Sequence, residues 1–330
     1  MMPFWLSITL IVLGSLVLLI LILFLIVELG YLKIFFKRGD GINCIDYYSP
    51  KEFKELSHDK IHFNSGKYQL TGFVYKNSKI KNYKAVVLVN HGIGFGHRYL
   101  LPLIEKIASD GFIVVAYDFT ASGISEGKRI KSMTQALLDN KAFFSYLSTR
   151  EDLKEYPLYL VGHSWGGYAS LASLNLNVKI DKVISFAGFS NELDLFTSTL
   201  KPIKILKPIF LLRNYIHYGK YSLMSGFKGV QLSSAKILYI QGEEDKVVSP
   251  SIGANLLSKV SNKNLQIKLL PNKGHSCFFT PESEKKALEV LSQFGMFSGK
   301  AYDPHLSIDY RKISRIDPDI VSLVLDFLNN

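Results

Sequence analysis

Cysteine, tryptophan and N-terminal basic residues are scarce in this sequence of 330 residues. It has two cysteines, Cys44 and Cys277, and two tryptophans. So few cysteines exclude a disulfide framework, and neither lies in a Cys/His cluster with the spacing of a zinc site. A reducing compartment is therefore the simpler expectation, and no metal site is expected.

Internal repeats and low-complexity tracts are also missing. With 48% hydrophobic and 20% charged residues, the composition is typical of a globular protein and argues against a disordered chain. The length accommodates one large α/β domain of roughly 250 to 280 residues with an additional element at one end. Two large independent domains would be a tight fit.

Positive charge is in excess, with a formal net charge of +11, but the Lys and Arg residues are scattered. The densest basic stretches, 76–84 and 201–207, have none of the motifs of a nucleic-acid-binding module. Attraction to anionic lipid headgroups, worth about 1 kcal/mol for each well-placed basic residue, is the simpler interpretation. We therefore expect membrane lipids, and no nucleic acid, as partners.

An uncharged apolar run extends from residue 4 to residue 27. As a helix it spans about 36 Å, more than the roughly 30 Å hydrocarbon core of a bilayer. A buried core helix is one alternative, but soluble proteins seldom enclose a helix that is apolar on every face. A cleaved signal peptide is another, although no Lys or Arg precedes Lys33 and residues 28–31 make a poor cleavage site. We expect a retained single-pass anchor over residues 1–30.

Basic residues stand on one side of this run only. Lys33, Lys37 and Arg38 follow it, whereas the three residues before it are uncharged. Because basic flanks resist translocation, the sequence predicts a cell-membrane protein with its N-terminus outside and its catalytic domain in the cytoplasm.

After a linker over residues 31–58, the hydrophobic pattern becomes that of strands alternating with helices. Alternating stretches on both sides of residues 64–67 predict an antiparallel hairpin. Continuous β-branched runs then fit strands buried on both faces, over residues 85–90, 112–117, 158–161, 182–186, 237–241 and 266–270. Apolar spacing near 3.6 predicts helices between them, over residues 100–109, 133–147, 164–174 and 252–260. This order indicates one α/β domain over residues 59–330 with a mostly parallel, doubly wound sheet.

Two segments interrupt the alternation. Residues 191–232 are rich in aromatic and aliphatic side chains and are expected to form a helical lid that binds an acyl chain. A helical subdomain with no ligand is the alternative for this segment. Residues 295–315 separate two further predicted helices, over residues 281–294 and 318–328.

The stretch Gly162-His163-Ser164-Trp165-Gly166 matches G-x-S-x-G where a predicted strand meets a predicted helix. In a nucleophile elbow the serine adopts a strained backbone conformation, and neighbours without Cβ allow the sharp turn. The motif therefore predicts that Ser164 is a nucleophile. A glycine-rich turn with an ordinary serine is the alternative.

A serine hydroxyl is a weak nucleophile until a base accepts its proton. In enzymes with this elbow the serine comes first, the acid second and the histidine last. His275 lies directly after the last predicted strand and is expected to be the base. Asp245 follows the preceding strand and is expected to orient it, with Glu243 and Glu244 as alternatives.

Two backbone N–H groups are expected to form the oxyanion hole, those of Trp165 and Ile93. Trp165 follows the nucleophile, and Ile93 follows the first buried parallel strand. His91 could act as a base, but its place at the end of that strand favours a structural role. The glycines near it lack the complete G-x-G-x-x-G pattern, so no dinucleotide and no other cofactor is expected.

Together these motifs resemble the α/β-hydrolase superfamily, and within it the branch of monoacylglycerol lipases, lysophospholipases and serine aminopeptidase-like domains. The resemblance begins near Ile61, and its motifs are residues 91–94, 98–99, 118–129, 162–166, 242–247 and 274–275. It implies an α/β-hydrolase fold with a helical lid insertion, preceded here by the membrane helix. Residues 119–123 depart from the family, in which a His-Gly pair is common at this place.

By this resemblance Ser164 is the nucleophile, Asp245 the acid and His275 the base, with Ile93 and Trp165 as oxyanion donors. We expect a membrane-anchored serine hydrolase that cleaves carboxylic esters, with monoacyl lipid-like substrates, through an acyl-serine intermediate. A peptidase or amidase is an alternative, because fold and triad do not determine the leaving group. A catalytically inactive membrane-tethered binding protein is a second alternative.

Overall fold

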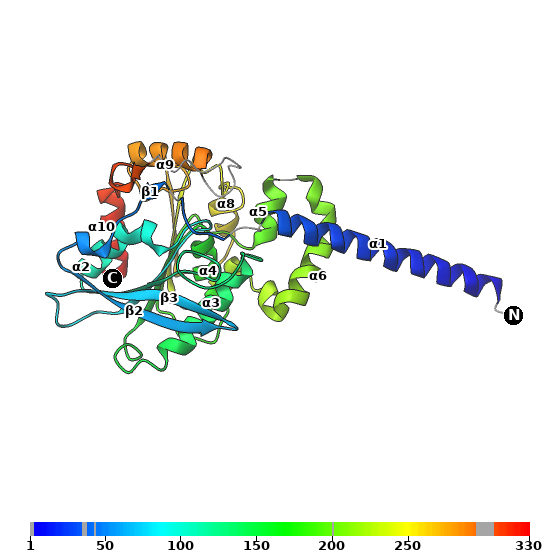
Figure 1. The fold of residues 1–330 in the computed structure, drawn as a ribbon, viewed down its shortest axis with the longest axis horizontal. Helices are drawn as coiled ribbons and strands as arrows, with labels where there is room; N and C mark the ends of the chain where they lie inside the picture. Colours follow the sequence, from blue (N-terminus) through cyan, green and yellow to red (C-terminus); the bar gives the residue numbers. More distant parts are fainter. Residues whose placement is uncertain (1–2, 35–37, 43, 200, 295–306) are drawn as a thin grey trace.

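The computed structural model describes residues 3–34, 38–42, 44–199, 201–294 and 307–330 (Figure 1). Most of the segment expected to separate the last two helices, residues 295–306, lies outside this range, as does Lys37.

A central sheet of eight strands organises the described chain, in the spatial order β2-β3-β5-β4-β6-β7-β8-β9. Strands β2 and β3 form the expected hairpin, β3 also pairs antiparallel with β5, and all other pairs are parallel. The mostly parallel sheet is therefore confirmed. The strands are β2 (Leu56–Ser65), β3 (Tyr68–Asn77), β4 (Val86–Asn90), β5 (Ile113–Tyr117), β6 (Leu158–His163), β7 (Lys182–Phe186), β8 (Lys236–Gly242) and β9 (Leu265–Leu270).

Helices cover both faces of the sheet, which explains the continuous apolar runs. Along β4, Val86 and Leu88 belong to one hydrophobic core, whereas Val87 and Val89 belong to the other. The first core includes α3 (Thr134–Leu147), α4 (Trp165–Ser173) and α8 (Ala254–Leu257). The second includes α2 (Leu101–Ser109), α9 (Pro281–Phe294) and α10 (Pro318–Asn329). Helix α8 is shorter than the predicted 252–260.

The segment expected to be a linker packs onto the domain. The N–H of Gly39 donates to the carbonyl of Ala121 at 2.8 Å, and that of Gly41 donates to the carbonyl of Gly94 at 3.0 Å. Strand β1 (Ile45–Asp46) then pairs in parallel with β10 (Ile308–Asp309). Residues 39–42 thus lie beside the loop that follows β4, and residues 45–46 pair with β10, so these parts of the segment expected to be a linker pack onto the domain.

The described residues of 191–232 are mainly helical, as expected, with α5 (Glu192–Thr199), α6 (Lys207–Tyr218) and α7 (Gly226–Leu232). The N-terminal helix α1 (Phe4–Ile34) projects away from the domain, and its last turns lie beside α5 and α6 (Figure 1). By length and composition α1 can cross a membrane.

Candidate active site

The backbone of Ser164 has φ +56° and ψ −114°, at the turn from β6 into α4. A non-glycine residue adopts such a conformation only where its surroundings impose it. A Cβ on Gly162 would lie 2.2 Å from the carbonyl oxygen of Gly166, and a Cβ on Gly166 would lie 2.2 Å from that of Asn90. The two glycines of the motif are thus required by close backbone approach, and the expected elbow is present.

The imidazole of His275 and the carboxylate of Asp245 meet at the ends of β9 and β8. Nδ1 of His275 lies 2.9 Å from Oδ2 and 3.1 Å from Oδ1 of Asp245. Oδ1 also accepts hydrogen bonds from the N–H groups of Val247 and Val248, both at 2.9 Å. Of the three carboxylates considered, only Asp245 is buried, whereas Glu243 and Glu244 are exposed. The geometry therefore favours Asp245 over its neighbours.

Asp245 is held in its charged form by these contacts. Burial by itself would raise the pKa of this carboxyl, but the His275 imidazole and the two N–H groups lower it below its usual value. An ionised carboxylate at Nδ1 keeps the proton on that nitrogen, so Nε2 faces the pocket as a proton acceptor.

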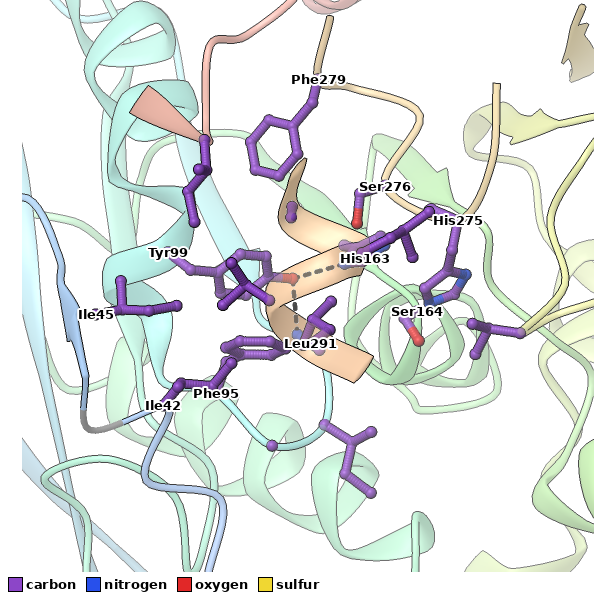
Figure 2. Close-up of a pocket in the computed structure, with 18 of the residues that line it drawn as sticks. Ile42, Ile45, Phe95, Tyr99, His163, Ser164, His275, Ser276, Phe279 and Leu291 are labelled. Atoms are coloured by element: carbon purple, nitrogen blue, oxygen red, sulfur yellow. Dashed lines mark hydrogen bonds between the residues drawn. The ribbon is translucent and has the colours of Figure 1, made fainter. Parts of the chain in front are cut away.

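Ser164 and His275 line the same pocket (Figure 2). Nε2 of His275 has no hydrogen-bond partner among the residues that the structure describes, and the contact to the Ser164 hydroxyl is not formed. In apo enzymes such catalytic contacts are often long and shorten when substrate binds.

The oxyanion donors proposed from the sequence flank Ser164. Trp165 is the first residue of α4, so its N–H has no acceptor within the helix. Ile93 lines the pocket together with Ser164. His91 is fully buried; its Nδ1 lies 2.8 Å from the carbonyl of Gly92 and its Nε2 accepts the N–H of Phe119 at 2.9 Å. These two contacts fit the structural role expected for His91.

An apolar cavity of about 430 Å³ extends from Ser164. Its walls come from the segment after α1, the loop after β4, helix α9 and the chain after β10, and include Ile42, Ile45, Phe95, Leu288, Leu291 and Ile313. No residue from 191–232 belongs to the wall among the described residues. The expectation that this insertion is the acyl-binding lid is therefore wrong for the described pocket.

The insertion packs instead against the end of α1. The rings of Phe196 and Phe210 lie 5.9 and 5.6 Å from the ring of Tyr31. The apolar residues from which an acyl site was expected thus include side chains that hold the N-terminal helix.

Comparison with known proteins agrees with this architecture. The family model described as "Serine aminopeptidase, S33" matches residues 81–211. The esterase Pf2001 of Pyrococcus furiosus superposes with a TM-score of 0.57 at 19% identity, over 77% of this chain and 99% of that one. The chain has the α/β-hydrolase fold, and its residues 81–211 are similar to the serine aminopeptidase S33 family. No curated protein sequence matches it.

Two further solved structures share this α/β-hydrolase fold. Est1E of Butyrivibrio proteoclasticus, solved with ferulic acid bound, gives a TM-score of 0.55 at 14% identity, over 82% of this chain and all of that one. The acylaminoacyl peptidase of Pyrococcus horikoshii gives 0.52 at 16% identity, over 77% of this chain and 44% of that one.

Three groups that position the candidate site were not found from the sequence. The Gly92 N–H donates to the Tyr99 hydroxyl at 3.0 Å, and that hydroxyl lies 2.6 Å from Nδ1 of His163 (Figure 2). Glu284 of α9 accepts the N–H groups of Gly274 at 2.9 Å and Ser276 at 2.7 Å, one on each side of His275. His163 and Tyr99 lie within recognised motifs, but nothing in the sequence marks Glu284.

Burial lowers the pKa of His163 to about 3, with His275 as a second cause. His163 is therefore neutral at physiological pH. As for metals, no group of three or more His, Cys, Asp or Glu side chains in the described part of the chain is arranged to bind an ion.

Proposed function

We propose that this α/β hydrolase is a serine esterase that is anchored to the membrane by α1 and cleaves carboxylic esters of monoacyl lipids. The observation that carries the proposal is the position of Ser164, strained at the elbow and facing an apolar cavity that also contains the His275 imidazole. Ser164, His275 and Asp245 are proposed as nucleophile, base and acid.

In the proposed reaction Nε2 of His275 takes the hydroxyl proton of Ser164 as Oγ attacks the ester carbonyl carbon. The carbonyl electron pair moves to the oxygen, where the N–H groups of Ile93 and Trp165 stabilise the negative charge. When the carbonyl re-forms, the alkoxide leaves with the proton from His275. Water then attacks the acyl-serine by the same route and releases the carboxylic acid. Asp245 remains ionised throughout.

The chemistry of the cavity supports an acyl chain as its occupant. None of its described lining residues is Lys, Arg, Asp or Glu. Each methylene transferred from water to such a cavity contributes about 0.8 kcal/mol. A peptide with a free α-amino group would need a carboxylate near Ser164, because an unpaired ammonium is costly to desolvate. The cavity therefore favours esters with an uncharged acyl chain over aminopeptidase substrates.

An amide-cleaving enzyme is the second candidate, because the matching family model is described as a serine aminopeptidase. Matched esters and anilides of one acyl group, with a free-amino peptide anilide, distinguish the two. We expect turnover of the ester to exceed that of both amides. Faster turnover of the peptide anilide would replace the esterase proposal.

A fluorophosphonate probe tests the nucleophile directly. We expect the full chain in detergent to be labelled at Ser164, and Ser164→Ala to lose both labelling and ester turnover. Ser276→Ala is the matched control, since Ser276 lines the same cavity. Ester turnover by folded Ser164→Ala would reject Ser164. A wild-type chain with neither labelling nor turnover would favour the inactive binding protein.

A further inference from the structure

Helix α6 buries polar side chains and exposes several apolar ones, although it also buries Phe210 and Tyr218. Arg213 and Asn214 are 2% and 3% exposed, whereas Tyr215 and Ile216 are 52% and 61% exposed. In a soluble protein the apolar stripe of a helix faces the core and the polar residues face water. The exposed apolar side chains of α6, here called the outer face, are Leu211, Leu212, Tyr215 and Ile216.

The buried polar side chains of α6 form contacts that bind α1 to the domain. Nε of Arg213 donates to Glu28 at 2.8 Å, and its guanidinium lies 3.8 Å from the ring centre of Tyr31. The Tyr31 hydroxyl donates at 2.9 Å to the buried carboxylate of Glu192, which also accepts from Asn214. An ion pair, a cation–π contact and a shared carboxylate thus connect the membrane helix to α5 and α6. The C-terminal end of helix α1 is therefore packed against the domain.

This docking brings the insertion up to the apolar run of α1. Val27 is the last residue of that run, yet it is only 3% exposed and belongs to the core that includes Phe210. The run is about 36 Å long and a hydrocarbon core is about 30 Å thick, so the end of the run reaches the headgroup boundary. An element that packs beside Val27 lies at that boundary.

We propose that the outer face of α6 is a second membrane contact, which lies in the boundary between headgroups and acyl chains beside α1. The proposal rests on the proposed anchoring by α1. Interfacial helices bury an apolar face about 5 to 10 Å into this layer. Exposed lysines near both ends of α6, Lys204, Lys207 and Lys220, supply the positive charge that anionic headgroups attract. Two contacts in place of one hold the catalytic domain at a defined orientation to the lipid surface.

Lipid-dependent quenching of a fluorophore tests this contact in the full chain. Single cysteines at Leu212 and at Ile216, in a Cys44→Ala/Cys277→Ala background, are labelled with an environment-sensitive dye. The chain is reconstituted in phosphatidylcholine–phosphatidylglycerol vesicles, with or without phosphatidylcholine that carries a doxyl group near the start of its acyl chain. We expect both positions to be quenched by the doxyl lipid.

Two reference positions show whether a negative result concerns the α6 contact alone or the anchoring by α1 as well. Leu18 lies in the middle of the apolar run and reports whether α1 spans the bilayer, and exposed Lys228 on α7 reports a water-facing site of the same insertion. Quenching at Leu18 without quenching at Leu212 and Ile216 would overturn the α6 proposal alone. Leu18 is read with phosphatidylcholine that carries the doxyl group near the end of its acyl chain, and no quenching there would overturn the anchoring and the α6 proposal with it. A dye at Leu212 that is shifted to shorter wavelength but not quenched would indicate a second protein copy, which also overturns the proposal.

A double substitution that places two negative charges on the outer face tests the contact through enzyme activity. Leu212→Glu/Ile216→Glu is expected to lower turnover of a long-chain ester embedded in vesicles while leaving that of a soluble short-chain ester unchanged. Lys228→Glu, an exposed control on α7, is expected to change neither. Equal turnover of the vesicle substrate by the double variant and the wild type would contradict a lipid contact at α6.

Discussion

Nε2 of His163 lies 3.0 Å from the backbone carbonyl oxygen of His275, although 112 positions separate the two residues. A carbonyl can only accept, so Nε2 carries the proton and Nδ1 accepts from the Tyr99 hydroxyl. That hydroxyl in turn accepts the Gly92 N–H. The residue before the nucleophile thus links the loop of the proposed oxyanion donor to the loop of the proposed base.

The Tyr99 hydroxyl is therefore expected to position the site. In Tyr99→Phe we expect kcat for a soluble ester to fall about fivefold with little change in KM, because a net hydrogen bond is worth about 1 kcal/mol. Tyr68→Phe on the hairpin is the control and is expected to behave as wild type. A rise in KM at constant kcat would assign Tyr99 to substrate binding.

The acid of the triad is tested by a matched pair of amide substitutions. Asp245→Asn leaves the shape unchanged but favours the wrong tautomer of His275, and losses of about 10⁴ in kcat are known for such a change. Glu244→Gln, on the exposed side of the same loop, is expected to retain activity. Kinetics with a soluble ester decide the assignment, and full activity of Asp245→Asn would transfer the role to Glu243 or Glu244.

Acyl-chain preference should depend on α9 and not on the insertion. Leu288→Ala removes part of the cavity wall and is expected to cost long-chain esters up to about 2 kcal/mol, or roughly thirtyfold in kcat/KM. Acetyl esters, which do not reach Leu288, should be unaffected. Phe196→Ala should change all chain lengths alike, because Phe196 contacts Tyr31. A selective long-chain loss in Phe196→Ala would restore the insertion as the acyl site.

Stability should fall in mild acid because of two buried neutral histidines. Burial lowers the pKa of His91 to about 4 and that of His163 to about 3, from 6.5. In acid the unfolded chain therefore binds protons that the folded chain does not bind. The contribution of the two neutral histidines to the free energy of unfolding is complete above pH 6.5 and is lost as pH falls through the folded pKa values. For His91 alone the loss is on the order of 3 kcal/mol.

Chemical denaturation of the full chain in detergent between pH 7 and pH 4 measures this effect. Replacement of His91 by Asn should destabilise the protein at neutral pH and flatten the pH dependence. An unchanged slope in His91→Asn would show that other groups cause the acid sensitivity.

The membrane topology is tested with a cysteine at Lys79, which is exposed on the domain surface. With the catalytic domain in the cytoplasm, this cysteine should resist an impermeant maleimide in intact cells and react after permeabilisation. Cys44 and Cys277 are buried and give a low background. Labelling in intact cells would reverse the topology, and a mature chain without residues 1–30 would identify a cleaved signal peptide.

Features that depend on local pattern could be predicted from the amino-acid sequence alone. Continuous apolar runs specify strands buried on both faces, and the glycines around Ser164 specify a sharp turn, so the parallel sheet and the elbow were predicted. The order of Ser164, Asp245 and His275 placed each at the end of a strand. Because parallel strands end at one edge of the sheet, these side chains were expected to lie close together there.

Contacts between distant segments could not be predicted in this way and became visible in the folded chain. The apolar residues of 191–232 have a composition that suits an acyl site and a helix-docking site equally well, and only the position of α1 distinguishes them. Likewise Ile42 lines the cavity because Gly41 is hydrogen-bonded to Gly94, and Glu284 holds the His275 loop because α9 packs beside it. Such contacts depend on which surfaces meet after folding, and hydrophobic periodicity reports only that a surface is apolar.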